Sequence, residues 1–370
     1  MKRKHILVNT HNLNLEGAPI FLFNLAKGFL DDFDVTMVSP KDGPLRERVE
    51  EAGIKVEIID FLDSKNVSQV KSIMKTCETS LVLFNTLILH NYISELSKGS
   101  AKFVWIIHES EVDLLLKNLQ FKGESFEKCD KVVFAANATK SLYMEYSKDA
   151  DHFHVIPNGV DLSSIEKFKN ENSKEQMRKK YKHSMKDFIF LDLGTLCWRK
   201  GQMDVVETFA SLFLGGKLSK NTYLYLVGDT KENNYAPEVV GFVKQHNLEK
   251  NIRIIPAVPH IYDFYRLADV FVFTSYIESF PLVTLDVMAF ELPILSTKVY
   301  GLNEQFRDEK EALVLTPNVY DEMKDGMLRL MGDTDLRQKL SANAFSRVNE
   351  KFELSSMYER YKDLFKTINV

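Results

Sequence analysis

The chain has few cysteines, no long apolar run and no leader-like start, and each absence excludes a class of protein. Cys77, Cys129 and Cys197 are spaced for neither a disulfide framework nor a metal site, and they suit a reducing compartment. No stretch approaches the roughly 18 apolar residues of a membrane-spanning helix. The apolar part of the initial segment MKRKHILVNTHN is too short for a signal-peptide core. We therefore expect a cytoplasmic protein, with peripheral attachment to the inner face of the membrane left open.

The chain also lacks an excess of basic charge. It has 48 Lys and Arg against 52 Asp and Glu and no basic arm, so no nucleic-acid partner is expected. With 45% hydrophobic and 27% charged residues, its composition is that of a globular protein. Its 370 residues exceed one typical core, which favours two domains.

Short β-rich runs alternate with amphipathic helical patterns along the chain. The expected strands are HILVN, VTMVS, KVEII, LVLFN, KFVWIIH and KVVFAA, followed by FIFLDLG, YLYLVGD, IRIIPA, VFVFTS and PILST. This alternation predicts an α/β fold of two Rossmann-like domains with parallel sheets, residues 1–161 and 162–351. Ligands of such sheets bind at the carboxyl ends of the strands, so we expect the sheets to face a deep interdomain cleft.

Two segments outside these strands read as helical. Residues 162–187 are polar and rich in lysine, which predicts a solvated helix at the start of the second domain; contact with a membrane or an acceptor is the alternative interpretation. Helical patterning also runs from Tyr320 to the end of the chain. Neither segment indicates a function by itself.

Two strand-end loops of the first domain carry candidate binding residues. In NTHNLNLEGAPIFLF, Gly17 permits close approach to a ligand and Pro19 suits the first turn of a helix, whose amides attract phosphate. Glu16 would repel a phosphate unless its carboxylate turns away. In WIIHES, His108 ends an apolar strand, where a ligand-contacting role competes with a structural one.

The loop LGTLCWRKGQMD of the second domain places two cations before an expected helix. Arg199 and Lys200 precede a helix expected to start near Gln202. Such a pair can neutralise a pyrophosphate leaving group. The alternative interpretation is an ordinary pair of basic residues on the surface.

The segment ESFPLVTLD places carboxylates around another expected helix, which we predict from about residue 281 to 290. Ser279 or Phe280 is the expected N-cap. Glu278 and Asp286 could reach opposite ends of an elongated ligand such as a sugar and a ribose. Alternatively, Glu278 only interacts favourably with the helix dipole, and Asp286 is an ordinary solvated residue of the helix.

The ordered set of these motifs resembles a known family. ADVFVFTSYIESFPLVTLDVMAFELPILST is similar to the signature of the retaining, GT-B-fold glycosyltransferases of the large family four, also called glycosyl transferases group 1. EGAP, IIHE, VVFAANATKSLY, VIPNGVD, LGTLCWRKGQ, LVGD and YGLNE occur in the family's order. The resemblance covers nearly the whole chain.

The resemblance implies a role for each candidate residue. It implies donor-phosphate contacts for Gly17, Arg199, Lys200, Ser279, Phe280, Leu282 and Val283, sugar contacts for His108 and Glu278, ribose contacts for Asp286, and a further donor contact for Glu304. It implies that the first domain lies on the acceptor side and the second binds the donor. It also implies that the C-terminal helix, about residues 352–370, packs on the first domain.

The implied activity is that of a retaining, metal-independent hexosyltransferase. The donor would be a nucleotide sugar such as a UDP- or GDP-sugar, with no further cofactor. The acceptor would be a glycan, a lipid-linked molecule or a protein, in the synthesis of cell-envelope or surface polysaccharide. Retention would come from front-face attack, with the departing phosphate accepting the acceptor's proton.

Some positions depart from the family pattern. Asp286 stands where Glu is usual, Glu16 and Glu291 where glycine or a small residue is usual, and Thr195 where arginine is common. These departures motivate an alternative, a catalytically weak subunit that binds or stabilises a partner transferase. A dehydrogenase is disfavoured because no glycine-rich dinucleotide fingerprint follows a strand.

Overall fold

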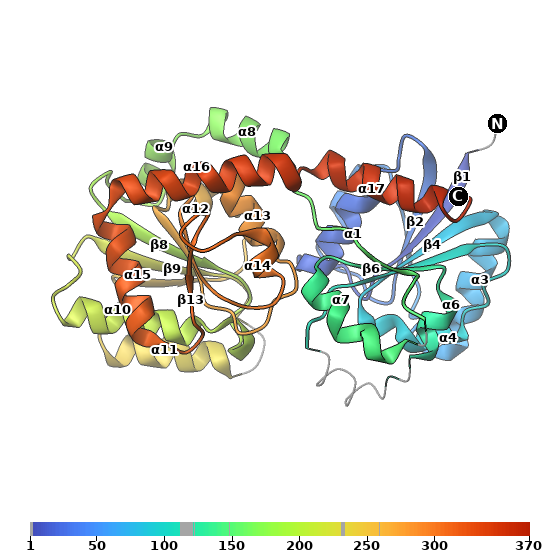
Figure 1. The fold of residues 1–370 in the computed structure, drawn as a ribbon, viewed down its shortest axis with the longest axis horizontal. Helices are drawn as coiled ribbons and strands as arrows, with labels where there is room; N and C mark the ends of the chain where they lie inside the picture. The colour runs from blue at the N-terminus through green and yellow to red at the C-terminus, as the bar shows by residue number, and fades with distance from the viewer. Residues whose placement is uncertain (1–2, 112–120, 122, 148, 231–233, 259) are drawn as a thin grey trace. The chain divides into compact units, whose positions relative to one another are not determined.

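The computed structural model describes residues 3–111, 121, 123–147, 149–230, 234–258 and 260–370. Contacts divide the chain into two compact units. The N-terminal domain comprises Met1–Gly159, Ser279–Leu282 and Leu354–Val370, and the C-terminal domain comprises Val160–Glu278 and Val283–Glu353. Each domain is built on its own parallel β-sheet with helices on both faces (Figure 1).

The N-terminal domain contains a seven-stranded sheet in the order β3-β2-β1-β4-β5-β6-β7. Its strands are β1 (Lys4–Asn9), β2 (Phe33–Ser39), β3 (Lys55–Ile58), β4 (Thr79–Asn85), β5 (Lys102–Ile107), β6 (Lys131–Phe134) and β7 (Phe153–Val155). Its helices are α1 (Gly17–Lys27), α2 (Arg46–Glu51), α3 (Val67–Thr76), α4 (His90–Glu95), α6 (Glu124–Lys128), α7 (Asn137–Tyr143) and α17 (Leu354–Lys366). All neighbouring strands are parallel, as the strand–helix alternation predicts.

Successive residues of each strand in this sheet enter opposite cores. Ile6 and Val8 of β1 pack in the core beneath α1, α2 and α17, whereas Leu7 packs in the core beneath α3, α4, α6 and α7. The C-terminal α17 lies next to α1 (Figure 1). A Cβ on Gly28 would lie 2.4 Å from the ring of Tyr358, so glycine is needed where the two helices meet.

The C-terminal domain contains a six-stranded sheet in the order β10-β9-β8-β11-β12-β13. Its strands are β8 (Phe188–Leu193), β9 (Thr222–Val227), β10 (Ile252–Ile255), β11 (Val270–Phe273), β12 (Ile294–Thr297) and β13 (Leu313–Leu315). Its helices are α8 (Leu162–Glu171), α9 (Lys174–Lys180), α10 (Gln202–Leu214), α11 (Tyr235–Gln245), α12 (Tyr262–Leu267), α13 (Leu282–Ala289), α14 (Leu302–Gln305), α15 (Tyr320–Gly332) and α16 (Thr334–Lys351). The core on one face lies under α10, α11 and α15. The predicted α/β fold with parallel sheets is therefore confirmed.

The lysine-rich stretch of residues 162–187 forms two helices, not the single solvated helix that its composition predicts. Ser173 is the N-cap of α9 and forms a capping box with Gln176. A new helix therefore starts at this point, and the chain turns between α8 and α9. The second helix also buries Met177 and Arg178. Its lysines therefore cover a packed helix, and Arg178 is part of the domain's interior.

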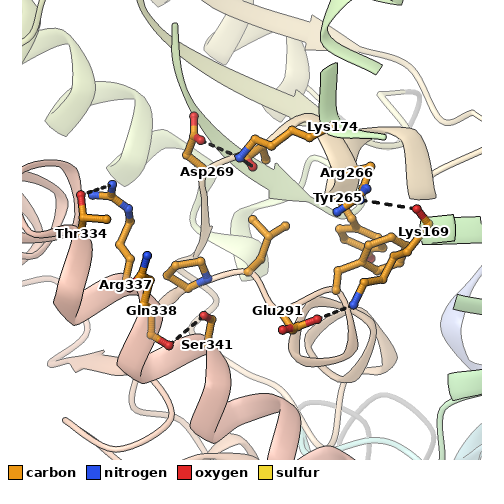
Figure 2. Close-up of a pocket in the computed structure, with 14 residues that line it drawn as sticks. Lys169, Lys174, Tyr265, Arg266, Asp269, Glu291, Thr334, Arg337, Gln338 and Ser341 are labelled. Atoms are coloured by element: carbon orange, nitrogen blue, oxygen red, sulfur yellow. Dashed lines mark hydrogen bonds and ion pairs between the residues drawn. The ribbon is translucent and has the colours of Figure 1, made fainter. Parts of the chain in front are cut away.

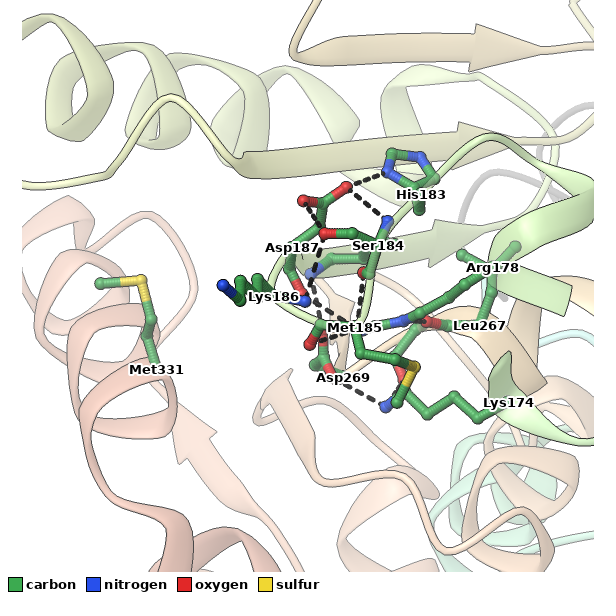
Figure 3. A network of polar contacts seen from close by, with 12 residues as sticks. Lys174, Arg178, His183, Ser184, Met185, Lys186, Asp187, Leu267, Asp269 and Met331 are labelled. Carbon is green, nitrogen blue, oxygen red and sulfur yellow. Dashed lines mark hydrogen bonds and ion pairs between the residues drawn. The ribbon is translucent and has the colours of Figure 1, made fainter. Parts of the chain in front are cut away.

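Arg178 fastens α9 to the amino ends of β8 and β11 (Figure 3). The residue is 2% exposed, and its Nη2 lies 2.5 Å from Asp269 Oδ2. Its Nε donates to the carbonyl of Leu267 at 3.0 Å, and its Nη1 donates to the carbonyl of Asp187 at 3.1 Å. Lys174 Nζ forms a second ion pair with the other carboxylate oxygen of Asp269, Oδ1, at 2.7 Å.

The sequence patterns miss two short strands, β7 and β13. Each has only three residues, Phe153–Val155 and Leu313–Leu315, at the edges of their sheets. A run of three apolar or mixed residues has too few positions to show a period of two, so it cannot be told from a loop. Their identity follows from pairing with β6 and β12.

Candidate functional site

In the C-terminal domain, the loops that follow β8 and β11 are bonded to each other. Gly201 has a φ of +66°, and a Cβ there would lie 2.4 Å from the carbonyl oxygen of Thr274, so glycine is required. The Thr274 hydroxyl donates to the Gly201 carbonyl at 2.9 Å. The N–H of Tyr276 donates to the carbonyl of Arg199 at 2.9 Å. These bonds hold the basic loop against the strand end that leads to Glu278.

The predicted basic pair lies against the first predicted acid. Lys200 Nζ is 2.5 Å from Glu278 Oε1, and Arg199 Nη1 is 3.1 Å from the same oxygen. Burial alone would raise the pKa of Glu278, but the charges of Lys200 and Arg199 outweigh it and hold the pKa below its ordinary value. The side chains of Glu278 and Lys200 are 9% and 13% exposed and that of Arg199 is 36% exposed, so the structure pairs an ionised carboxylate with one mostly buried and one partly exposed cation.

A second buried acid near Lys200 was missed by sequence reasoning. Asp192 lies in β8 and is 2% exposed. Burial raises its pKa to about 7, against the opposing charge of Lys200 and a hydrogen bond with Gln202. The signal that could have found it is a lone carboxylate in the otherwise apolar strand FIFLDLG.

The helix of the ESFPLVTLD segment is present but begins at Leu282, so the expectation that Ser279 or Phe280 is its N-cap is wrong. Pro281 directly precedes the helix. The Ser279 hydroxyl instead lies 2.8 Å from that of Thr139, and Asn158 Nδ2 donates to the Phe280 carbonyl at 2.7 Å. Both side chains are committed to anchoring this segment, which clusters with the N-terminal domain.

Asp286 is the fifth residue of α13 and lies partly buried in the C-terminal domain, as does Val283. Burial raises the pKa of Asp286 to about 7, and the charge of Asp161 adds to the rise. Within the part of the chain that the structure describes, no hydrogen bond to its carboxylate is seen. A desolvated carboxylate of this kind gains free energy from any ligand that supplies hydrogen-bond donors.

Glu304 lies on α14, which is tied to α13. The Thr284 hydroxyl of α13 donates to the side-chain oxygen of Gln305 on α14. The backbone carbonyl of Glu304 accepts a hydrogen bond from Arg347 Nη2 at 2.9 Å. Glu304 therefore sits on a fixed element next to the helix that carries Asp286.

In the N-terminal domain, His108 follows the carboxyl end of β5 and belongs to a short chain of hydrogen bonds. Its Nε2 lies 2.7 Å from Oδ1 of Asn85, the last residue of β4. The Asn85 Nδ2 donates to the carbonyl of Ala18 at 2.8 Å. Burial lowers the pKa of His108 to about 3, and the nearby charge of His11 adds to the effect. His108 is therefore a neutral imidazole.

Glu16 does turn its carboxylate into its own loop. Its oxygens accept hydrogen bonds from Asn14 Nδ2 at 2.8 Å and Asn12 Nδ2 at 3.3 Å. The interaction with His11 is the largest factor that lowers the pKa of Glu16 to about 2. Gly17, the first residue of α1, is exposed, and a Cβ there would meet nothing within 4 Å. The start of α1 is thus left open to a ligand.

A cavity of about 400 Å³ lies at the opposite, amino-terminal ends of the strands of the C-terminal domain (Figure 2). Asp269 and Pro293 in its wall directly precede β11 and β12. Glu291 also lines it and has a φ of +56°, a left-handed conformation that favours glycine over other residues. Lys169 Nζ pairs with Glu291 at 2.5 Å. The departure of Glu291 from the family pattern is therefore accommodated locally, by its ion pair with Lys169.

The described residues include neither a membrane-spanning helix nor a cluster of metal ligands. No helix among them is long and apolar enough to cross a lipid bilayer. No group of three or more His, Cys, Asp or Glu side chains in the described ranges is arranged to hold a metal ion.

Solved structures share this fold. The structure of HepE from Anabaena in complex with UDP and glucose superimposes with a TM-score of 0.82 at 18% sequence identity, covering 99% of this chain and 100% of that one. Together with the two parallel-sheet Rossmann-like domains, this likeness defines the fold as GT-B, the architecture of a large class of glycosyltransferases.

Sequence comparison identifies the family within that class. The model described as glycosyl transferases group 1 matches residues 173–347, and the model described as Glycosyltransferase Family 4 matches residues 15–164. The chain belongs to the glycosyl transferases of group 1, as its motifs predict.

Named relatives share about a quarter or less of the sequence. The UDP-Gal:alpha-D-GlcNAc-diphosphoundecaprenol alpha-1,3-galactosyltransferase of Escherichia coli is 22% identical over 354 residues, covering 90% of this chain and 89% of the relative. The capsular polysaccharide biosynthesis glycosyltransferase CapM of Staphylococcus aureus is 24% identical over 211 residues, covering 57% of this chain and 53% of the relative.

Proposed function

We propose that the chain is a retaining, metal-independent hexosyltransferase that uses a nucleotide sugar and acts in the synthesis of a cell-envelope polysaccharide. The observation that carries the proposal is the cluster of Arg199 and Lys200 with Glu278, four positions before the start of α13 in the chain. It combines cations for a departing diphosphate with a buried, ionised acid for sugar hydroxyls.

The charges of the cluster suit the chemistry of glycosyl transfer. Departure of a nucleoside diphosphate leaves an oxocarbenium-like sugar and concentrates negative charge on the leaving phosphate. Lys200 and Arg199 stabilise that charge. When the donor's phosphates bind to these cations, the ion pairs of the cations with Glu278 weaken. The freed Glu278 oxygen then accepts hydrogen bonds from sugar hydroxyls.

Asp286 and the remaining candidates complete the proposed donor contacts. Asp286 accepts from the ribose hydroxyls, which would relieve the desolvation that raises its pKa to about 7. Backbone amides of Ser279, Phe280, Leu282 and Val283, with Gly17 from α1, are proposed to contact the phosphates. Glu304 is a further donor contact, and His108 meets a hydroxyl of the transferred sugar.

The acceptor class is proposed from the relatives. The Escherichia coli relative is named for a galactosyl transfer onto a diphosphoundecaprenol-linked sugar, and the Staphylococcus aureus relative for capsular polysaccharide. We infer a lipid-linked or glycan acceptor presented at a membrane surface. Retention would follow front-face attack, in which the departing phosphate accepts the proton of the acceptor hydroxyl.

A panel of UDP- and GDP-sugars tests the donor. A true donor at a hundredfold excess over its dissociation constant stabilises the native state by about 2.7 kcal/mol, which raises the melting temperature. NMR of the product assigns the anomeric configuration, which we expect to match the donor's. Excess EDTA should leave the rate unchanged. An inverted product or a rate abolished by EDTA would overturn that part of the proposal.

A further inference from the structure

The side chain of Asn85 links the start of α1 to His108 in the N-terminal domain. Asn85 is fully buried at the carboxyl end of β4, which pairs with both β1 and β5. One end of its amide meets the carbonyl of Ala18 at 2.8 Å, and the other meets His108 Nε2 at 2.7 Å. The amide therefore spans two elements that both carry proposed donor contacts.

The chemistry of these contacts determines which ring nitrogen of His108 carries the proton. The carbonyl of Ala18 can only accept, so the amide nitrogen of Asn85 must face it. The amide oxygen then faces the imidazole and can only accept, so His108 Nε2 must donate. In a neutral ring this leaves Nδ1 as a lone-pair acceptor.

The surroundings of His108 also disfavour the imidazolium. The rings of Phe21 and His108 pack in an edge-to-face arrangement, with centroids 4.7 Å apart, and a positive charge on His11 opposes a second one on His108. Glu109 directs its carboxylate to the backbone N–H groups of His108 and Leu87, both at 3.0 Å, which commits it to the backbone. In the described parts of the chain no hydrogen bond to His108 Nδ1 is seen, and the side chain is partly exposed.

We propose that Asn85 is a positioning residue that holds His108 as the neutral Nε2–H tautomer, so that Nδ1 accepts a hydrogen bond from a substrate hydroxyl. This inference rests on the proposed function for the identity of the substrate. It adds a selectivity rule: the group that meets His108 is a hydroxyl of a neutral sugar, and an anionic group such as a uronic carboxylate is repelled by the lone pair.

The tautomer is measured directly by side-chain nitrogen NMR on the full chain with 15N-labelled histidine. The chain has nine histidines, and a His108→Gln variant identifies the His108 signals by their loss. We expect a pyrrole-type Nε2 and a pyridine-type Nδ1 that do not change between pH 8 and pH 5. A proton on Nδ1, or protonation of the ring above pH 6, would overturn the inference.

A matched pair of variants tests the part played by Asn85. Asn9 is an equally buried asparagine at the end of β1, whose Nδ2 donates to the Leu83 carbonyl and whose Oδ1 accepts from Tyr92. Asn85→Leu should shift the His108 signals toward a mixture of tautomers, and Asn9→Leu should leave them unchanged. Equal effects of both changes would reduce Asn85 to a structural role and contradict the proposal.

A pH profile connects the tautomer to the reaction. In Asn85→Asp a carboxylate would favour the imidazolium, whose Nδ1 carries a proton and cannot accept. The ratio of variant kcat to wild-type kcat, with the donor found by the panel at saturation, should therefore rise at least tenfold between pH 6 and pH 9. If the NMR signals of His108 shift but the ratio of kcat values does not change with pH, the proposed contact between His108 and the substrate hydroxyl would be overturned. No transfer or hydrolysis of any donor by the wild type would overturn the proposed function instead, and with it the substrate part of the inference.

Discussion

Lys200 Nζ lies 2.5 Å from Glu278 Oε1, although the residues are 78 positions apart in the sequence. The contact depends on the close approach of Gly201 to Thr274, which joins the loops after β8 and β11. The pair is therefore a product of the parallel sheet, which places both strand ends at one edge.

Lys200→Ala should weaken the binding of UDP by about tenfold to a hundredfold, the range expected for loss of a hydrogen bond to a charged group. Isothermal calorimetry measures the affinity, and a thermal melt checks that the variant is folded. Arg199→Ala should cost less, because its side chain is 36% exposed and screened by solvent. Lys217→Ala, at an exposed lysine of the same domain, is the control. Unchanged affinity in a folded Lys200→Ala protein would remove Lys200 from the site.

Asp286 should make the affinity for UDP depend on pH. Ribose hydroxyls donate to the ionised form, and the ionised fraction of a group with a pKa of about 7 rises about tenfold between pH 6 and pH 8. Affinity should therefore rise over this range, and the part of the rise due to Asp286 should vanish in Asp286→Asn. Asp192→Asn is the control, because Asp192 has a similarly raised pKa and no proposed ribose contact. The same slope in wild type and Asp286→Asn would refute the contact.

The same carboxyl should reduce the stability of the unliganded protein at neutral pH. The folded pKa of Asp286 is about 7 against an ordinary value of 3.8, so the folded state binds the proton more tightly than the unfolded state. Its stabilising contribution is complete below about pH 3.8 and is lost as the pH rises through 7. Asp286→Asn should therefore melt a few degrees above wild type at pH 8, a difference that shrinks toward pH 5. A lower melting temperature at pH 8 would contradict this.

Arg178→Met should destabilise the C-terminal domain by about 3–5 kcal/mol, because it leaves partly buried Asp269 with one cationic partner fewer and several carbonyls without a donor. Urea unfolding measures the change. Lys179→Met, at the next and exposed position of α9, should change the free energy of unfolding by less than about 0.5 kcal/mol. Similar effects of the two variants would show that the network in Figure 3 contributes little.

Glu291→Gly and Glu291→Ala separate backbone strain from the ion pair with Lys169. Both lose the pair, which at 47% exposure of Glu291 contributes at most about 1 kcal/mol. Only glycine relieves the left-handed φ of +56°, so Glu291→Gly should be more stable than Glu291→Ala by about 1 kcal/mol in urea unfolding. Equal stability of the two variants would show that the turn is not strained.

Much of the fold could be predicted from local patterns, because parallel strands buried on both faces are nearly continuous apolar runs. KFVWIIH and FIFLDLG are examples that the structure confirms as β5 and β8. The break between α8 and α9 was missed because a lysine-rich composition hid the capping pair of Ser173 and Gln176. β7 and β13 are too short to show a period.

The candidate site could be predicted only as separate pieces. Strand-end position pointed to His108, Arg199, Lys200 and Glu278, but which of them touch depends on strand order and on bonds between loops. Asn85 gave no signal, because its role comes from the orientation of one amide between Ala18 and His108. Glu291 looked like a departure that weakens the site, and only its φ and its pairing with Lys169 show that it is a local structural feature.

The most direct test of the proposed function is the turnover of the donor by wild type and Glu278→Gln. Each nucleotide sugar of the panel is incubated with and without a lipid-linked acceptor, and released nucleoside diphosphate is measured. We predict release by the wild type with at least one donor, and a loss of at least a hundredfold in Glu278→Gln, which keeps its size but loses its charge, with the melting curve still cooperative. A wild type that neither binds nor turns over any donor, or a Glu278→Gln variant with the wild-type rate, would contradict the account.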